Sequence, residues 1–156
     1  MKKFAFSLEH ILDYRRQLES DRKLAFSKAA EIFRRREGQL RTLADELADY
    51  RNRLARMGTG RISARELALY RSYLTYIETQ VEQAVVWLRD AGSDVEDRRR
   101  QLAAASKDKQ VLEKVKEVKR AEYDYQASRE ETAVLDEIGS NRFLADLTVA
   151  KAGKPS

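Results

Sequence analysis

The sequence is short of the residues that build catalytic and metal centres. Its 156 residues include no cysteine, one histidine and one proline. Without cysteine the chain forms no disulfide and no cysteine-ligated zinc or iron–sulfur site. His10 lies near Glu9 and Asp13, but one imidazole with two carboxylates is a weak metal signal. Since a glycine-rich phosphate loop is missing as well, we expect no metal, no cofactor and no enzyme activity.

Long apolar runs are also missing. No stretch has the roughly 20 predominantly apolar residues that a membrane-spanning helix needs. The opening residues, 1–6, resemble the start of a signal peptide, but Ser7, Glu9 and His10 interrupt the apolar run too early. The sequence therefore predicts a soluble, cytoplasmic protein.

Charge is abundant but mixed in sign. Charged residues make up 37% of the chain, and the formal net charge is +5. The densest basic runs, Arg34–Arg36 and Arg98–Arg100, stand beside acidic residues such as Glu37 and Asp94. Solvated helix faces with ion pairs three or four residues apart are the favoured interpretation. We expect no nucleic-acid partner, and a coil that coats DNA is kept as an alternative.

The strongest positive signal is an apolar repeat in the middle of the chain. A repeat of 3.5 residues sustained over about six heptads is typical of a coiled-coil seam. A helix of this length must bury such a stripe against another helix. Counted by alternate threes and fours, the predicted seam positions are Leu67, Tyr70, Leu74, Ile77, Val81, Ala84, Leu88, Ala91, Val95, Arg98, Leu102, Ala105, Lys109 and Leu112.

The N-terminal third supplies the partner helix. Arg15, Arg22 and Arg36 interrupt its stripe, and a spacing of four and four around Arg36 predicts a stutter that locally unwinds the supercoil. Long basic side chains can lie along a seam and keep their charge in water, so these positions weaken the pairing without splitting it. The predicted apolar positions are Leu8, Ile11, Leu18, Ala25, Ala29, Ile32, Leu40, Leu43, Leu47, Tyr50, Leu54 and Met57.

A short reversal joins the two helices. Gly58 suits a left-handed position at the end of the first helix, and Ser63 with Glu66 forms a capping box for the second. The sequence predicts an all-α fold, a long antiparallel two-helix coiled-coil hairpin in a single domain, 1–156. We expect a helix over about 7–57, a turn over about 58–63, a helix over about 64–138 and a flexible tail over 139–156. Gly139 marks the expected end of the second helix, whose last part protrudes unless residues 1–7 fold back over it.

Three segments of the chain together resemble the FliJ family, the small coiled-coil component of the flagellar protein-export apparatus. They are Phe4–Arg15, which opens the first helix, Ile62–Ile77 after the turn, and the C-terminal stretches Leu112–Lys116 and Glu130–Ile138. The resemblance implies a fold similar to the central shaft of rotary ATP synthases. It also implies binding to the hexameric export ATPase and its regulator, contact with the linker of the membrane export gate, and handling of export chaperones. The protein would then be peripheral at the inner membrane through its partners. Because the hairpin closes its own seam, we expect a monomer when the protein is alone.

The resemblance places the gate-binding surface just after the turn. It maps onto Tyr73, Ile77, Gln80 and Ala84, and Tyr76 lies beside them as an aromatic that points away from the seam. Ile77 also falls on the seam, so plain packing is an equal alternative for it. Trp87 is interpreted as packing at the edge of the seam.

The open end of the hairpin is the predicted ATPase-binding site. It carries Ile11, Tyr14 and Arg15 on one helix and Leu135, Ile138 and Arg142 on the other. Apolar groups without an intramolecular partner can be buried by a protein ring, and basic groups suit acidic loops around its hole. A generic structural or dimerising coil is the alternative function.

Overall fold

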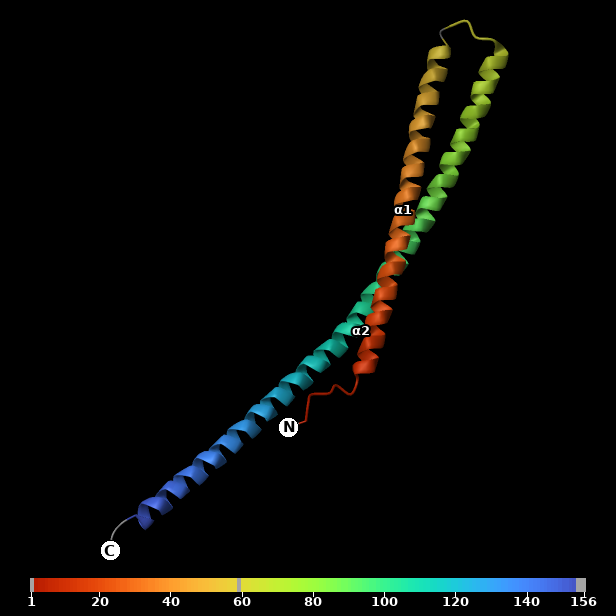
Figure 1. Ribbon diagram of the computed structural model, residues 1–156. Coiled ribbons are helices and arrows are strands. Elements are labelled where there is room, and N and C mark those ends of the chain that lie inside the picture. The colour runs from red at the N-terminus through yellow and green to blue at the C-terminus, as the bar shows by residue number, and fades with distance from the viewer. Residues whose placement is uncertain (1, 59, 154–156) are drawn as a thin grey trace. The chain divides into compact units, whose positions relative to one another are not determined.

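Two long helices make up almost the whole molecule (Figure 1). The computed structural model describes residues 2–58 and 60–153, in which α1 spans Glu9–Met57 and α2 spans Ala64–Ala152, with no strand. The predicted all-α class is therefore confirmed. The chain divides into a turn unit, Arg15–Lys107, and a terminal unit, built from residues up to Tyr14 and from Asp108 onward. The single domain stays a prediction.

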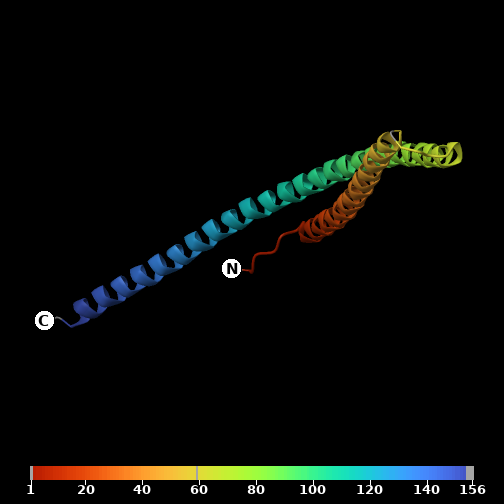
Figure 2. The same cartoon turned by 90° about the horizontal axis from the view of Figure 1, so that it is seen from above.

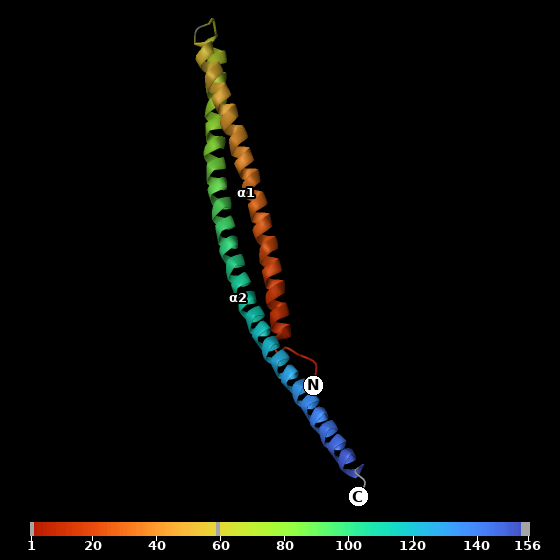
Figure 3. The same cartoon turned by 90° about the vertical axis from the view of Figure 1, so that its left-hand side faces the viewer.

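The helices of the turn unit run antiparallel (Figures 1 and 3). The ring centroids of Tyr50 and Tyr73 lie 4.5 Å apart. Further from the turn, the guanidinium of Arg22 donates to the side-chain carbonyl of Gln101 at 3.0 Å. A lower residue number on α1 therefore pairs with a higher residue number on α2, which is the arrangement of the predicted hairpin.

The predicted seam of α2 is confirmed position by position. Every predicted residue from Leu67 to Leu112 is buried or half-buried, including Arg98 and Lys109. The most buried of them in the turn unit are Ile77, Ala84 and Ala105. Burying a large aliphatic side chain such as that of Ile77 contributes about 1.5–3 kcal/mol.

The predicted register of α1 is wrong at two places. Ile11 and Ile32 are exposed, while the neighbouring Leu12 is fully buried and Phe33 is half-buried. With these two residues the spacing alternates between four and three without interruption, so the predicted stutter is absent. The alternating positions are Leu8, Leu12, Arg15, Glu19, Arg22, Phe26, Ala29, Phe33, Arg36, Leu40, Leu43, Leu47, Tyr50, Leu54 and Met57, and the predicted Leu18 and Ala25 are half-buried beside Glu19 and Phe26.

One seam position of the turn unit is acidic. Glu19 is buried, and its carboxylate accepts a hydrogen bond from the hydroxyl of Ser106 at 2.8 Å. The ammonium of Lys23 lies 3.5 Å from the same oxygen. A buried carboxylate needs such partners, because unpaired charge in an apolar seam is strongly destabilising.

The turn confirms one predicted cap and corrects another. The hydroxyl of Ser63 accepts a hydrogen bond from the N–H of Glu66 at 3.1 Å, which is the first of the two bonds of a capping box. Gly58 does not adopt the expected left-handed conformation. Its φ is not positive, and the same holds for every other described glycine. Its N–H instead donates to the carbonyl of Leu54 at 3.3 Å, which continues the helical pattern by one residue.

Helix α2 passes the residue at which it was expected to end. It continues through Gly139 to Ala152, so the expected end of the helix near Ile138 is wrong. The last residues of that tail, 154–156, lie outside the described ones. Glycine inside a helix costs about 1 kcal/mol relative to alanine, and the neighbouring leucine, glutamate and arginine residues favour the helix enough to offset it. The first helix begins at Glu9, two residues after the expected start.

Candidate partner-binding surfaces

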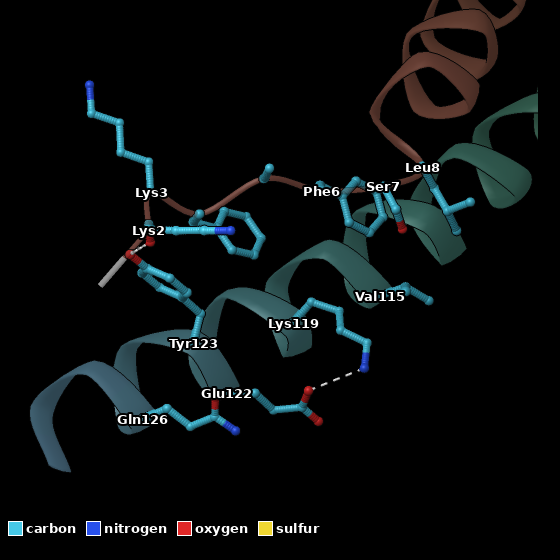
Figure 4. A pocket seen from close by; sticks show the side chains of 12 residues that line it. Lys2, Lys3, Phe6, Ser7, Leu8, Val115, Lys119, Glu122, Tyr123 and Gln126 are labelled. Atoms are coloured by element: carbon cyan, nitrogen blue, oxygen red, sulfur yellow. Dashed lines mark hydrogen bonds and ion pairs between the residues drawn. The ribbon is translucent and has the colours of Figure 1, made fainter. Parts of the chain in front are cut away.

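Residues 2–8 of the terminal unit, here called the strap, lie along α2 (Figure 4). The strap has no helix before the turn at Ser7 and Leu8. The hydroxyl of Tyr123 donates a hydrogen bond to the backbone carbonyl of Lys2. Next to the strap, the first turn of α1 is tied to α2 by Glu9, whose carboxylate lies 2.8 Å from the ammonium of Lys116. The N-terminal residues therefore fold back over α2.

Beyond the strap, α2 has no cover among the described residues. Figures 1, 2 and 3 show its blue part in the terminal unit without another segment alongside. Every residue from Ser128 to Gly153 is exposed. Among them, Val134 and Ile138 follow Ala127 at helical spacing and continue the stripe that carries Leu112 and Tyr123. The large apolar side chains exposed here are Val134, Leu135, Ile138, Phe143, Leu144, Leu147 and Val149.

The predicted ATPase-binding residues do not form one patch. On α2, Leu135 is 67% and Ile138 49% exposed. Ile11 and Tyr14 are exposed on α1, whose first turn meets α2 at Lys116. Leu135 is 19 residues further along α2, about 28 Å at 1.5 Å per residue. The residues on the two helices are therefore separate surfaces. Arg142 is exposed beside Ile138, and Arg15 is half-buried in the turn unit.

The predicted gate-binding residues divide into buried and exposed ones. Ile77 is 1% and Ala84 4% exposed, so in the closed hairpin their side chains pack in the seam. Gln80 is half-buried. Tyr73 is 38% and Tyr76 57% exposed. Because Tyr73, Tyr76 and Gln80 are spaced by three and four, they follow one face of α2 beside the seam. This exposed face can meet a partner while the hairpin stays closed.

Tyr73 is fixed by contacts with α1. Its hydroxyl donates to the carboxylate of Glu46 at 2.7 Å, and its ring packs on that of Tyr50. The hydrogen bond to Glu46, with partial burial, raises the pKa of Tyr73 to about 12. The ring of Tyr76 stands 6.0 Å from that of Tyr73 and completes an aromatic cluster.

The same face continues to Trp87 and includes residues that the sequence analysis missed. The guanidinium of Arg36 stacks over the ring of Trp87 at 4.7 Å. Between the helices lies a groove of about 490 Å³, lined by residues that include Gln39, Thr42 and Gln80. The α1 residues of this face could have been found from the uninterrupted heptad register, in which Gln39 and Glu46 flank the seam. Trp87 is exposed on one side and stacked on the other, so it packs at the seam edge as predicted.

The arginine runs are largely paired within their own helices. In the second run, Arg99 donates to Glu96 at 2.6 Å and Arg98 lies 3.5 Å from Asp94. The hydrogen bond from Arg99 lowers the pKa of Glu96 and raises that of Arg99. In the first run, Arg35 lies 3.2 Å from Glu31. This pairing agrees with solvated helix faces.

Neither a metal cluster nor a membrane span occurs in the described chain. Over residues 2–58 and 60–153, the acidic and histidine side chains form no group that could hold a metal ion. In the same ranges neither helix has an apolar stretch long enough to cross a bilayer. The described chain has three surfaces that another molecule could bind. They are the face of the turn unit with Tyr73, Tyr76, Gln80 and Trp87, here called the aromatic face, the strap with the helix beneath it, and the exposed part of α2.

Comparisons with known proteins identify the family. A comparison with curated proteins finds no match, and neither does one with solved structures. The family described as "Flagellar FliJ protein" matches residues 4–147, which is nearly the whole chain. That range includes the helical hairpin, most of the strap and the exposed α2 segment as far as Leu147. The chain therefore belongs to the FliJ family of flagellar export proteins.

Proposed function

We propose that this protein is the central stalk of the flagellar export ATPase, promoting assembly of the ATPase ring and coupling the ring to the membrane export gate. Family membership makes it a component of the flagellar export apparatus. The stalk role rests on the likeness to the shaft of rotary ATP synthases that the family resemblance implies for a two-helix hairpin. In this role the protein is peripheral to the inner membrane through its partners, and it also handles export chaperones.

The observation that carries the proposal is the exposed apolar stripe on α2 between Ser128 and Ala152. Apolar side chains such as those of Leu135 and Ile138 favour burial by about 25 cal/mol per Å² of apolar surface. A helix exposed on all sides is poorly stabilised by its own hydrogen bonds in water. A protein ring that closes around this segment would bury its apolar side chains and stabilise its helix. Few intramolecular contacts would have to break for the ring to bind.

The aromatic face of the turn unit is the proposed contact with the gate. Tyr73 and Tyr76 are exposed there beside Gln80, and aromatic residues are enriched among the anchors of protein interfaces. Because Ile77 and Ala84 are buried, we assign them the role of holding α2 against α1 so that the two tyrosines keep their positions.

Stimulation of the purified export ATPase tests the stalk role. Deletion of residues 136–156, or the double substitution Leu135→Ser and Ile138→Ser, is expected to abolish stimulation. The matched control is Val111→Ser with Val118→Ser, which changes two exposed apolar residues of α2 outside that segment. Full stimulation by the truncated protein would move the ATPase contact away from α2's C-terminal segment.

A further inference from the structure

The strap binds α2 as an extended peptide. Its residues alternate, with Phe4, Phe6 and Leu8 half-buried and Lys3, Ala5 and Ser7 exposed. A period of two is the pattern of an extended chain with one face on a surface. The surface beneath it is α2 from Val115 to Gln126 (Figure 4). A helix thus receives an extended segment here, where a coiled coil would place a second helix.

Two groups of α2 hold the first aromatic side chain of the strap. The ring of Phe4 lies 5.5 Å from that of Tyr123, at an angle of 56°. The guanidinium of Arg120 stands over the Phe4 ring at 5.1 Å. Tyr123 also donates its hydroxyl proton to the carbonyl of Lys2, so one residue recognises both the side chain and the backbone of the peptide.

The attachment of the strap is light. Phe4 and Phe6 are half-buried, and a groove of about 460 Å³ remains between the strap and α2. Two backbone carbonyls of the strap accept hydrogen bonds from backbone N–H groups of α1. Phe6 accepts from Glu9 at 3.1 Å, and Leu8 accepts from Leu12 at 2.9 Å. Both hydrogen bonds belong to the start of α1 and do not tie the strap to α2. The strap is therefore held on α2 by side-chain packing and by one hydrogen bond, which the hydroxyl of Tyr123 donates.

We propose that the face of α2 formed by Val115, Lys119, Arg120 and Tyr123 is a peptide-binding site. Its ligand class is an extended protein segment with aromatic side chains two residues apart, and the strap is its resident ligand. Phe4 and Phe6 line the groove on this face, while the hydroxyl of Tyr123 binds the backbone carbonyl two residues before the first aromatic residue.

A segment from another protein must displace the strap to use this site. A tethered ligand competes at an effective concentration in the millimolar range, because its linker is short. The strap therefore keeps the site closed to weak ligands and opens it to a partner that supplies a better segment or a second contact. Displacement leaves α1 and α2 intact, since the strap itself contains no helix before Glu9.

A labelled peptide measures the site directly. The probe is a fluorescein-tagged peptide with the sequence of residues 2–10, and the control peptide has serine at both phenylalanine positions. Fluorescence anisotropy compares the wild-type protein with the double variant Phe4→Ser and Phe6→Ser, in which the site is emptied. Phe143→Ser with Leu147→Ser serves as the matched control variant, because it removes two exposed apolar residues elsewhere on α2.

The emptied variant is expected to bind the probe at least tenfold more tightly than wild type or the control variant. The control peptide should not bind, and adding Tyr123→Ala to the emptied variant should remove probe binding. Far-ultraviolet circular dichroism should be the same for all variants. Equal affinity for wild type and emptied variant, absence of probe binding to the emptied variant, or binding that survives Tyr123→Ala would each overturn the proposal.

Discussion

Single residues decide which face of the hairpin a partner can reach. Ile77 and Tyr76 are neighbours in sequence, but one is buried in the seam and the other is exposed. The sequence analysis left packing and partner binding open for Ile77, since periodicity alone allows both. Burial resolves the geometry: Tyr76 and the edge of Tyr73 are open to a partner, while the side chain of Ile77 packs between the helices.

If this face is the proposed contact with the gate, we expect binding to depend most on Tyr76, which is the more exposed of the two tyrosines. Tyr76→Ala is expected to weaken binding to the gate linker by about 1–3 kcal/mol, as loss of an exposed aromatic anchor does. Tyr73→Ala would also remove the contacts with Glu46 and Tyr50, so its effect mixes binding with stability. Isothermal titration calorimetry gives the affinities. Val85→Ala, on the opposite face of α2, is the control, and an unchanged affinity for Tyr76→Ala would refute the assignment.

Tyr73 should also give the turn unit a measurable dependence on alkaline pH. Its pKa rises from 10.0 to about 12 because the protonated hydroxyl donates to Glu46. The hydrogen bond therefore stabilises the fold fully below pH 10, and that contribution is lost as the pH rises through 12. In an absorbance titration of tyrosinate, a late step near pH 12 is expected from Tyr73. Tyr73→Phe should remove this late step, and its persistence would show that another tyrosine causes it.

At the level of the helices, the heptad pattern predicted the α2 seam correctly and the α1 seam with errors at two places. On α2 adjacent apolar residues such as Leu69–Tyr70 and Val111–Leu112 also occur, but a regular repeat over about six heptads decides between them. On α1 the pairs Ile11–Leu12 and Ile32–Phe33 offer two adjacent apolar residues, and the first of each pair was chosen wrongly. Gly92 explains why Phe33 and not Ile32 packs in the seam, since the missing side chain of Gly92 makes room for the Phe33 ring. Such a cross-helix fit is not visible in the periodicity of one helix.

The ends of the helices were harder to predict than their seams. Gly139 was interpreted as a stop, but a single glycine does not end a helix whose neighbours favour it. The strap alternates with a period of two over only a few residues, which is too short for a pattern to identify. Its place on α2 depends on Tyr123 and Arg120, more than a hundred residues away in the sequence.

Two glycines test the packing of the helices. A methyl group added at Gly38 meets nothing within 4 Å, whereas at Gly92 it lies 3.3 Å from the Phe33 ring. Gly38→Ala is therefore expected to stabilise the protein by about 1 kcal/mol through helix propensity. Gly92→Ala should gain clearly less, because the ring has to move. Thermal unfolding compares the two, and an equal gain at Gly92 would argue against close packing with Phe33.

The molecule as a whole closes its long seam within one chain. The turn unit pairs α1 with α2 over most of the length of α1, so no second copy is needed to bury the stripe. We therefore expect a monomer of 18.1 kDa. Sedimentation equilibrium over a range of concentrations checks this mass. A stable dimer would favour the alternative function, a dimerising coil that pairs through the exposed stripe of α2.

Hydrogen exchange with and without the purified export ATPase tests the stalk role most directly. Alone, the amides around Leu47 and Ile77 should exchange slowly, and those of residues 128–152 should exchange fast, because that part of α2 is exposed on every side. On binding the ATPase, residues 128–149 should become protected while the amides around the turn do not change. Protection confined to the turn, with residues 128–149 still exchanging fast, would contradict the account and place the turn in the ring.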